Sequence, residues 1–248
     1  DSVDSSIYSN LPANKDSLLE LVKLTGEDTN RVNVLYKLTT VLPLYSDTTR
    51  TVIRQALQLS LNLNYTPGIV NSANTLGNYY YFRAQNDSAG YYYKLALGLV
   101  DRTWDSISIG RTYGNMGNYY KSLGQFDSSI YYTKLGYEIF TAIGDKARVG
   151  IILNNLGFSY VQIGEFDSAI DCHLRSLEIK QSMNDSHGVS ISYTNIATIY
   201  FDQGEIEKMK PYFVKALAID SAMNDTNAMA GDYNNLGEYY RNVNKFDT

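Results

Sequence analysis

Residues 153–169 read LNNLGFSYVQIGEFDSA, and this stretch decides the fold because its pattern returns along the chain at a fixed interval. At each return a glycine or alanine recurs, an aliphatic residue or methionine precedes it, and a tyrosine follows three positions later. The recurring small residues are Gly77, Gly117, Gly157, Ala197 and Gly237, and the tyrosines are Tyr80, Tyr120, Tyr160, Tyr200 and Tyr240. Self-similarity at one fixed period of this length is the signature of a repeat protein.

Within one period the apolar residues are spaced as on a helix. Leu153 and Leu156 share one helix face, and a second apolar run follows Gly164. Gly164 suits the left-handed end of a helix, and we expect Asp167 to cap the helix that comes next. Residues 183–185, Met-Asn-Asp, repeat this arrangement with asparagine in place of the glycine. Each period is therefore predicted to be a helix, a turn, a second helix and another turn.

The pattern resembles the tetratricopeptide repeat. The residues that carry the resemblance are Leu156-Gly157, Tyr160, Gly164, Phe166 and Ala169. The common repeat of that family has about 34 residues, whereas this period of 40 resembles the longer repeats of kinesin light chains. The resemblance implies an all-α, right-handed superhelical solenoid of antiparallel helix pairs. It also implies that the chain binds proteins or peptides in a concave groove.

The repeat divides the chain into three predicted parts. We expect residues 1–15 to be a flexible leader and residues 16–65 to form an N-terminal helix with a degenerate first repeat. Residues 66–248 are expected to form the repeat array, with repeats starting near residues 70, 110, 150, 190 and 230. The last repeat lacks its second helix, so we interpret the sequence as a piece of a longer chain. Its last helix is expected to expose an apolar face with Leu236 and Tyr240, through which the protein could associate with itself.

Composition excludes several classes of function. Lys and Arg number 21 against 26 Asp and Glu, which gives a net charge of -5 and no basic surface for nucleic acid. No apolar run approaches the ~18 residues of a membrane span. Cys172 and His173 are neighbours that point about 100° apart on a helix, and His187 is expected to be a solvent residue. Since no catalytic, metal-binding or cofactor-binding motif is present, we expect no enzymatic activity, metal or cofactor in this segment.

Asparagines and aromatic residues recur beside the repeat glycine, away from the predicted buried face. In the related family this side of the first helix lines the groove, so we predict a peptide-binding surface there. Its residues are Asn74, Asn78, Tyr81, Asn115, Asn118, Asn154, Asn155, Phe158, Asn195, Phe201 and Asn235. Amides can both donate to and accept from an extended peptide backbone. The alternative is that the asparagines tie neighbouring helices together. A carboxylate clamp is not expected, because its cations are missing.

Two further resemblances concern the cellular context. The opening residues resemble the exported repeat regions of bacterial sensors, which precede a kinase or DNA-binding output domain. Asp-Ser pairs such as Asp87-Ser88 and Asp167-Ser168 resemble an O-glycosylation acceptor, although helix capping alone also explains them. These resemblances imply a periplasmic or otherwise exported input domain that works with its own output domain. The alternatives are a cytoplasmic peptide-responsive regulator, an assembly adaptor and a purely structural scaffold.

Overall fold

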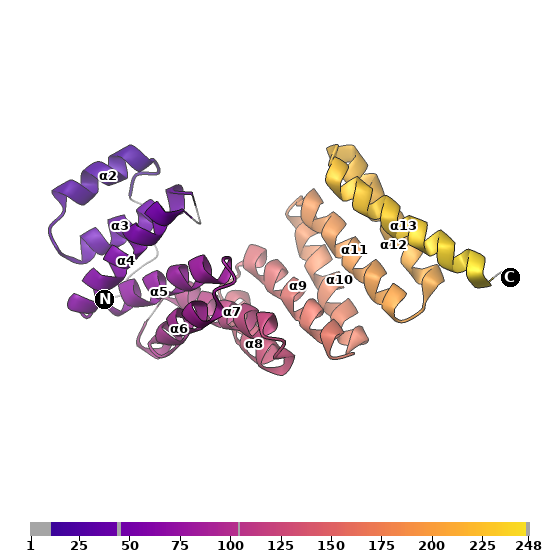
Figure 1. Cartoon of the computed structure of the whole chain (residues 1–248), viewed down its shortest axis with the longest axis horizontal. Coiled ribbons are helices and arrows are strands. Elements are labelled where there is room, and N and C mark those ends of the chain that lie inside the picture. The colour runs from indigo at the N-terminus through magenta and orange to yellow at the C-terminus, as the bar shows by residue number, and fades with distance from the viewer. Residues whose placement is uncertain (1–10, 44–45, 104, 247–248) are drawn as a thin grey trace. The chain divides into compact units, whose positions relative to one another are not determined.

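A computed structural model describes residues 11–43, 46–103 and 105–246, so most of the predicted leader lies outside the described residues. The chain divides into two units at residue 143 (Figure 1). The first unit contains α2 (Lys15–Leu24), α3 (Thr29–Val41), α4 (Asp47–Asn62), α5 (Thr66–Tyr81), α6 (Asn86–Leu97), the short 3-10 helix η1 (Val100–Arg102), α7 (Ser106–Ser122) and α8 (Phe126–Ala142). The second contains α9 (Lys146–Gln162), α10 (Phe166–Ser182), α11 (Ser186–Asp202), α12 (Ile206–Met223) and α13 (Thr226–Phe246).

Neighbouring helices form antiparallel pairs in both units, which confirms the predicted all-α class (Figure 1). We call α5, α7, α9, α11 and α13 the first helices and α6, α8, α10 and α12 the second helices. The first helices begin at equal intervals along the chain, and each second helix begins halfway between two of these starting points. That interval equals the spacing of the repeat glycines. The repeat seen in the sequence is therefore the spacing of the helix pairs.

The turns follow from residues that tolerate a left-handed backbone. Gly164 ends α9 with a φ of 79°, and Asn184 ends α10 with a φ of 55°, as predicted. Asp185 caps α11 by accepting a hydrogen bond from the backbone N–H of Gly188. The cap predicted at Asp167 is wrong, because α10 already begins at Phe166 and its N-cap residue is Glu165, without a side-chain bond. Asp167 lies in the first turn, where its negative charge interacts favourably with the helix dipole.

The repeat glycine lets a large side chain of the second helix approach the first helix. A Cβ atom on Gly157 would lie 2.5 Å from Nε2 of His173, and the ring of Tyr93 stands in the same place beside Gly77. At Gly77 and Gly157, the glycine of a first helix is thus matched by a ring of the following second helix. The repeat tyrosines from Tyr80 to Tyr200 are half-buried, Tyr160 included, and Tyr240 is exposed. Tyr80 stacks on Tyr92 of the following second helix with ring centroids 5.5 Å apart.

Candidate binding surface on the first helices

The asparagines of the first unit bond across neighbouring first helices. The Nδ2 atom of Asn74 donates to Oγ1 of Thr112 at 2.7 Å, and Nδ2 of Asn115 donates to Oδ1 of Asn74 at 3.1 Å. The sequence placed Asn74 on an open surface, but its side chain is 1% exposed because α7 covers it. Both asparagines therefore fix the position of α7 against α5.

The other predicted residues of the first unit have different surroundings. Oδ1 of Asn78 accepts a hydrogen bond of 2.7 Å from the hydroxyl of Tyr93, which ties α5 to α6. Asn118 occupies the same place on α7 and is partly exposed. Tyr81 is half-buried and contacts the exposed ring of Phe82 edge-on, with centroids 5.4 Å apart. Tyr81 also packs against the cluster that contains Tyr93, so Asn78 and Tyr81 both serve the contact between α5 and α6.

A polar network that sequence reasoning missed joins α3, α5 and α7. Nη1 of Arg111 donates to the hydroxyl of Tyr36 at 2.6 Å, and Nη2 donates to Oδ1 of Asn71 at 2.9 Å. The same oxygen of Asn71 accepts a bond of 2.6 Å from Oγ of Ser108. Asn71 and Arg111 occupy the same position in successive repeats, so alignment of the repeats could have shown a polar residue there in both. The network stabilises the contact between these three helices.

In the second unit the same bond between first helices recurs. Nδ2 of Asn195 on α11 donates to Oδ1 of Asn154 on α9 at 2.8 Å, which matches the Asn115–Asn74 bond. Asn155 is half-buried beside this pair. Phe158 on α9 keeps 46% of its surface exposed, and Ile151 keeps 59%. The face of α9 therefore offers apolar surface next to amides that hold α11.

Two cavities open between α11, α12 and α13 in the second unit. The first, of about 210 Å³, is lined by His187, Ser190, Ile191, Thr194, Asn195, Asp220, Ala228, Gly231, Asp232 and Asn235. The second, of about 220 Å³, is lined by Thr198, Phe201, Asp202, Met209, Phe213, Asn235 and Glu238. Asn235 borders both cavities. Of the predicted residues, the structure thus brings Asn195, Phe201 and Asn235 together on what we call the α11–α13 strip, the lining of these two cavities.

Two carboxyl groups line the first cavity. Asp220 on α12 and Asp232 on α13 are 2% and 3% exposed, and Oδ2 of Asp220 accepts a bond of 2.6 Å from Oγ of Ser190. Burial raises the pKa of Asp232 to about 7, and the hydrogen bond and charge of Asp220 act in the same direction. Neither residue was predicted to be functional. Alignment of the repeats could have drawn attention to Asp232, because this acidic residue takes the buried place that the neutral Thr112 and Ser192 hold in earlier repeats.

Cys172 and His173 lie inside the second unit, on α10. Both side chains are buried, and burial, aided by the charge of Lys180, lowers the pKa of His173 to about 4. His187 is exposed at the first cavity. Among the described residues, no three His, Cys, Asp or Glu side chains are placed to hold a metal ion. No helix within that part of the chain is long and apolar enough to cross a membrane.

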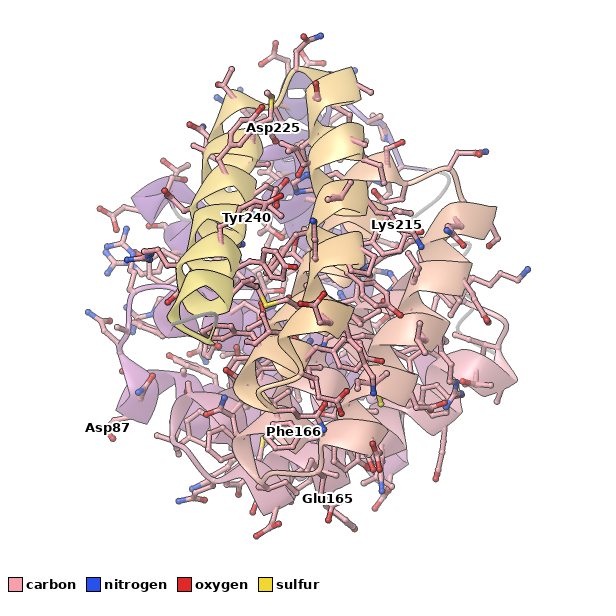
Figure 2. The ribbon with its side chains drawn as sticks, turned by 90° about the vertical axis from the view of Figure 1, so that its right-hand side faces the viewer. Asp87, Glu165, Phe166, Lys215, Asp225 and Tyr240 are labelled. Carbon is pink, nitrogen blue, oxygen red and sulfur yellow. The ribbon has the colours of Figure 1, made fainter. Side chains whose placement is uncertain are left out.

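The last helix leaves part of its apolar surface open. Tyr240 of α13 is exposed, and Asp225 stands at the turn that leads from α12 into α13 (Figure 2). Leu236 is partly buried, because it packs against the cluster that contains Met209 and Phe213. The predicted open face thus belongs to Tyr240 rather than to Leu236.

Comparison with known proteins identifies the repeat. Residues 108–182 and residues 191–223 each match the tetratricopeptide repeat. A search of curated protein sequences found no relative of this chain.

Solved structures agree at the level of the fold. BtubC (BKLC) from P. vanneervenii has a TM-score of 0.73 and 22% identity over 90% of this chain and 93% of its own. A Rap protein complexed with Competence and Sporulation Factor has a TM-score of 0.64 and 13% identity, over 93% of this chain and 70% of its own. A signal-transduction ATPase of the STAND class with a tetratricopeptide repeat sensor, from Pyrococcus horikoshii, has a TM-score of 0.71 and 16% identity. That match covers 88% of this chain but only 33% of the ATPase.

Proposed function

We propose that this chain, a tetratricopeptide-repeat protein, is a non-enzymatic scaffold that binds a protein or peptide segment on the α11–α13 strip. The observation that carries the proposal is the pair of adjoining cavities that share Asn235. One combines the carboxyl groups of Asp220 and Asp232 with the apolar side chain of Ile191, and the other combines the rings of Phe201 and Phe213 with polar side chains. A seam that offers both polar and apolar groups suits an extended polypeptide, which presents backbone amides and side chains in turn.

The first helices are fit for this role because their own bonds hold the strip in place. The Asn195–Asn154 bond fixes α11 against α9, so the amide of Asn195 is positioned before a ligand arrives. A pre-positioned surface loses less conformational entropy on binding than a flexible one. The amides predicted to grip a ligand therefore also serve the helix contacts, and the two roles are compatible.

The comparisons support a signalling context for such a scaffold. One structural neighbour is described as a Rap protein complexed with Competence and Sporulation Factor, and another carries its repeats as a sensor. We infer that the chain is the input or interaction region of a bacterial signalling protein, exported as its opening residues imply. Cell fractionation of the tagged whole protein tests the compartment, and recovery only in the cytoplasm would favour the cytoplasmic regulator or adaptor instead.

Site-directed photocrosslinking tests the binding surface. A benzoylphenylalanine is placed at Thr198, an exposed residue of the second cavity, or at Glu178, an exposed residue of the second helix α10. In cells that make the whole protein, a discrete adduct with a polypeptide is expected from Thr198 and not from Glu178. Asn235→Trp fills the junction of both cavities and should remove the adduct. Equal adducts from both sites, or an adduct that survives Asn235→Trp, would contradict the proposal.

A further inference from the structure

The first cavity of the α11–α13 strip contains two carboxyl groups with unfilled acceptor positions. Oδ1 of Asp220 and Oδ2 of Asp232 are buried, and no N–H or alcohol group among the described residues donates a hydrogen bond to either atom. The hydrogen bond between the two carboxyl groups requires one of them to keep its proton. Both carboxyl groups line the cavity. Burying a carboxylate oxygen without a hydrogen-bond donor costs more free energy than burying a neutral polar atom without one, and two neighbouring carboxylates also repel each other. The site is therefore built to be completed by a group that donates hydrogen bonds and carries positive charge.

The cavity has no cation of its own. Of its lining residues, only Asp220 on α12, Asp232 on α13 and His187 on α11 are ionisable, and no lysine or arginine is among them. Asp225, close by at the start of α13, is acidic as well and accepts a bond from the backbone N–H of Ala228. The two carboxyl groups are thus the acidic groups of a lining that otherwise carries hydroxyl, amide, imidazole and apolar groups. A proton on Asp232 neutralises half of their charge, and an ammonium group from a ligand would neutralise it in place of that proton.

The preceding repeat shows how the same seam accommodates an ammonium group. Lys180 on α10 and Ser192 on α11 stand one full repeat before Asp220 and Asp232. There Nζ of Lys180 donates to Oγ of Ser192 at 3.1 Å. Burial lowers the pKa of the lysine, and the charge of Asp185 opposes that shift. One repeat thus fills the seam with its own lysine, whereas the next presents two carboxyl groups and leaves the space open.

We propose that the first cavity binds the primary ammonium group of the polypeptide held on the α11–α13 strip, with Asp220 and Asp232 as its two acceptors. Three donors on one nitrogen match two carboxylates and a nearby hydroxyl or amide oxygen, for which Ser190, Thr194 and Asn235 are placed. The volume of about 210 Å³ is well above the ~10–15 Å³ that holds one water molecule on the same measure, so the cavity has room for the ammonium end of a lysine side chain. The assignment rests on the proposed function and names the group that this surface selects.

Three small probes test the proposal on the whole protein at pH 8, each followed by NMR titration. Nα-acetyl-lysine N-methylamide offers a side-chain ammonium group, norleucine N-methylamide offers an α-amino group that is about half protonated at this pH, and Nα-acetyl-norleucine N-methylamide offers neither. We expect at least one of the first two to bind tenfold or more tightly than the neutral probe, and the better of the two identifies the source of the ammonium. Equal shifts with all three probes would overturn the assignment.

Matched variants distinguish binding in the first cavity from attraction of the probes to other carboxyl groups of the protein. Asp232→Asn keeps the shape of the side chain and should abolish the preference for ammonium probes, whereas Glu178→Gln removes an exposed carboxyl group of α10, outside both cavities, and should leave it unchanged. Asp220→Asn repeats the test if Asp232→Asn loses its helical circular dichroism. An ammonium preference that survives in folded variants at both positions would refute the proposal. If the probes fail but the Thr198 adduct still depends on Asn235, the ammonium assignment falls and the binding surface stands.

Discussion

Replacing His173 by phenylalanine removes a buried group whose ionisation opposes folding. The histidine ring is 3% exposed against Gly157, and its Nδ1 atom has no partner among the described residues. Phenylalanine or tyrosine already occupies the equivalent place in other repeats, as Phe213 and Tyr93. His173→Phe is therefore expected to pack in the same position without a titrating group.

The magnitude follows from the two pKa values. Burial lowers the pKa of His173 from 6.5 to about 4 in the folded protein. Between these values the unfolded chain binds a proton that the folded protein does not, so stability is lost as pH falls from about 6.5 towards 4. A pKa difference of about 2.5 at about 1.4 kcal/mol for each tenfold change gives a full loss of about 3.5 kcal/mol in the free energy of unfolding. About 3 kcal/mol of it is reached at pH 4, where the folded histidine is half protonated. The variant should not show this loss.

Urea titration at pH 7 and at pH 4, followed by the amide NMR signals of α10, measures the effect in the second unit. The loss of stability between the two pH values should be about 3 kcal/mol larger in the wild type than in His173→Phe. Comparison with the variant removes the contributions of other groups that titrate in this range. If both proteins change by the same amount, His173 is not buried in its neutral form, and the packing against Gly157 is misplaced.

Three further changes give independent tests. Gly157→Ala forces a Cβ atom against the ring of His173 and should lower the free energy of unfolding in urea by about 1–3 kcal/mol. Gly237→Ala, with no atom within 4 Å of the added carbon, should not lower it. Equal urea midpoints for the two variants would contradict the close contact at Gly157. Asp232 has a raised pKa, so its contribution to stability should be lost as pH rises from about 4 through about 7. Asp232→Asn should remove that loss from urea titrations across this range. If the free energy of unfolding changes with pH as much in the variant as in the wild type, the burial of Asp232 beside Asp220 is wrong. A double-mutant cycle of Asn154→Ala and Asn195→Ala should give a coupling of about 1 kcal/mol, and no coupling would show that the amides act independently.

Local chemistry made much of the fold predictable. The helix spacing fixed which residues face one another within a pair, and Gly164 and Asn184 marked turns that require a left-handed backbone. The predicted cap at Asp167 was wrong by two residues, because the N-cap residue is Glu165. An Asp-Ser pair at a helix start fits either the cap or the first turn, so the sequence did not distinguish the two.

The candidate site was less accessible because its contacts join residues of different repeats. The burial of Asn74 depends on how closely α7 approaches α5, which a pattern within one repeat does not specify. Asp220 and Asp232 meet only where α12 turns into α13, and Asp220 belongs to an Asp-Ser pair of the kind that sequence alone places on the surface. The sequence indicated the α11–α13 strip only in part, through Asn195, Phe201 and Asn235.

The equal spacing of helix starts has a consequence for how such a chain can change its length. From Thr66 to Thr226 the helices begin at regular intervals, and helices of two kinds alternate. Unequal crossing-over that deletes or duplicates one helix pair, for instance between Asp185 and Asp225, rejoins two identical capping positions and keeps each first helix in register with the second helix that follows it. A change by a single helix would keep the turns but place a second helix where a first helix has to pack. Viable length variants of this gene are therefore expected to differ by whole helix pairs.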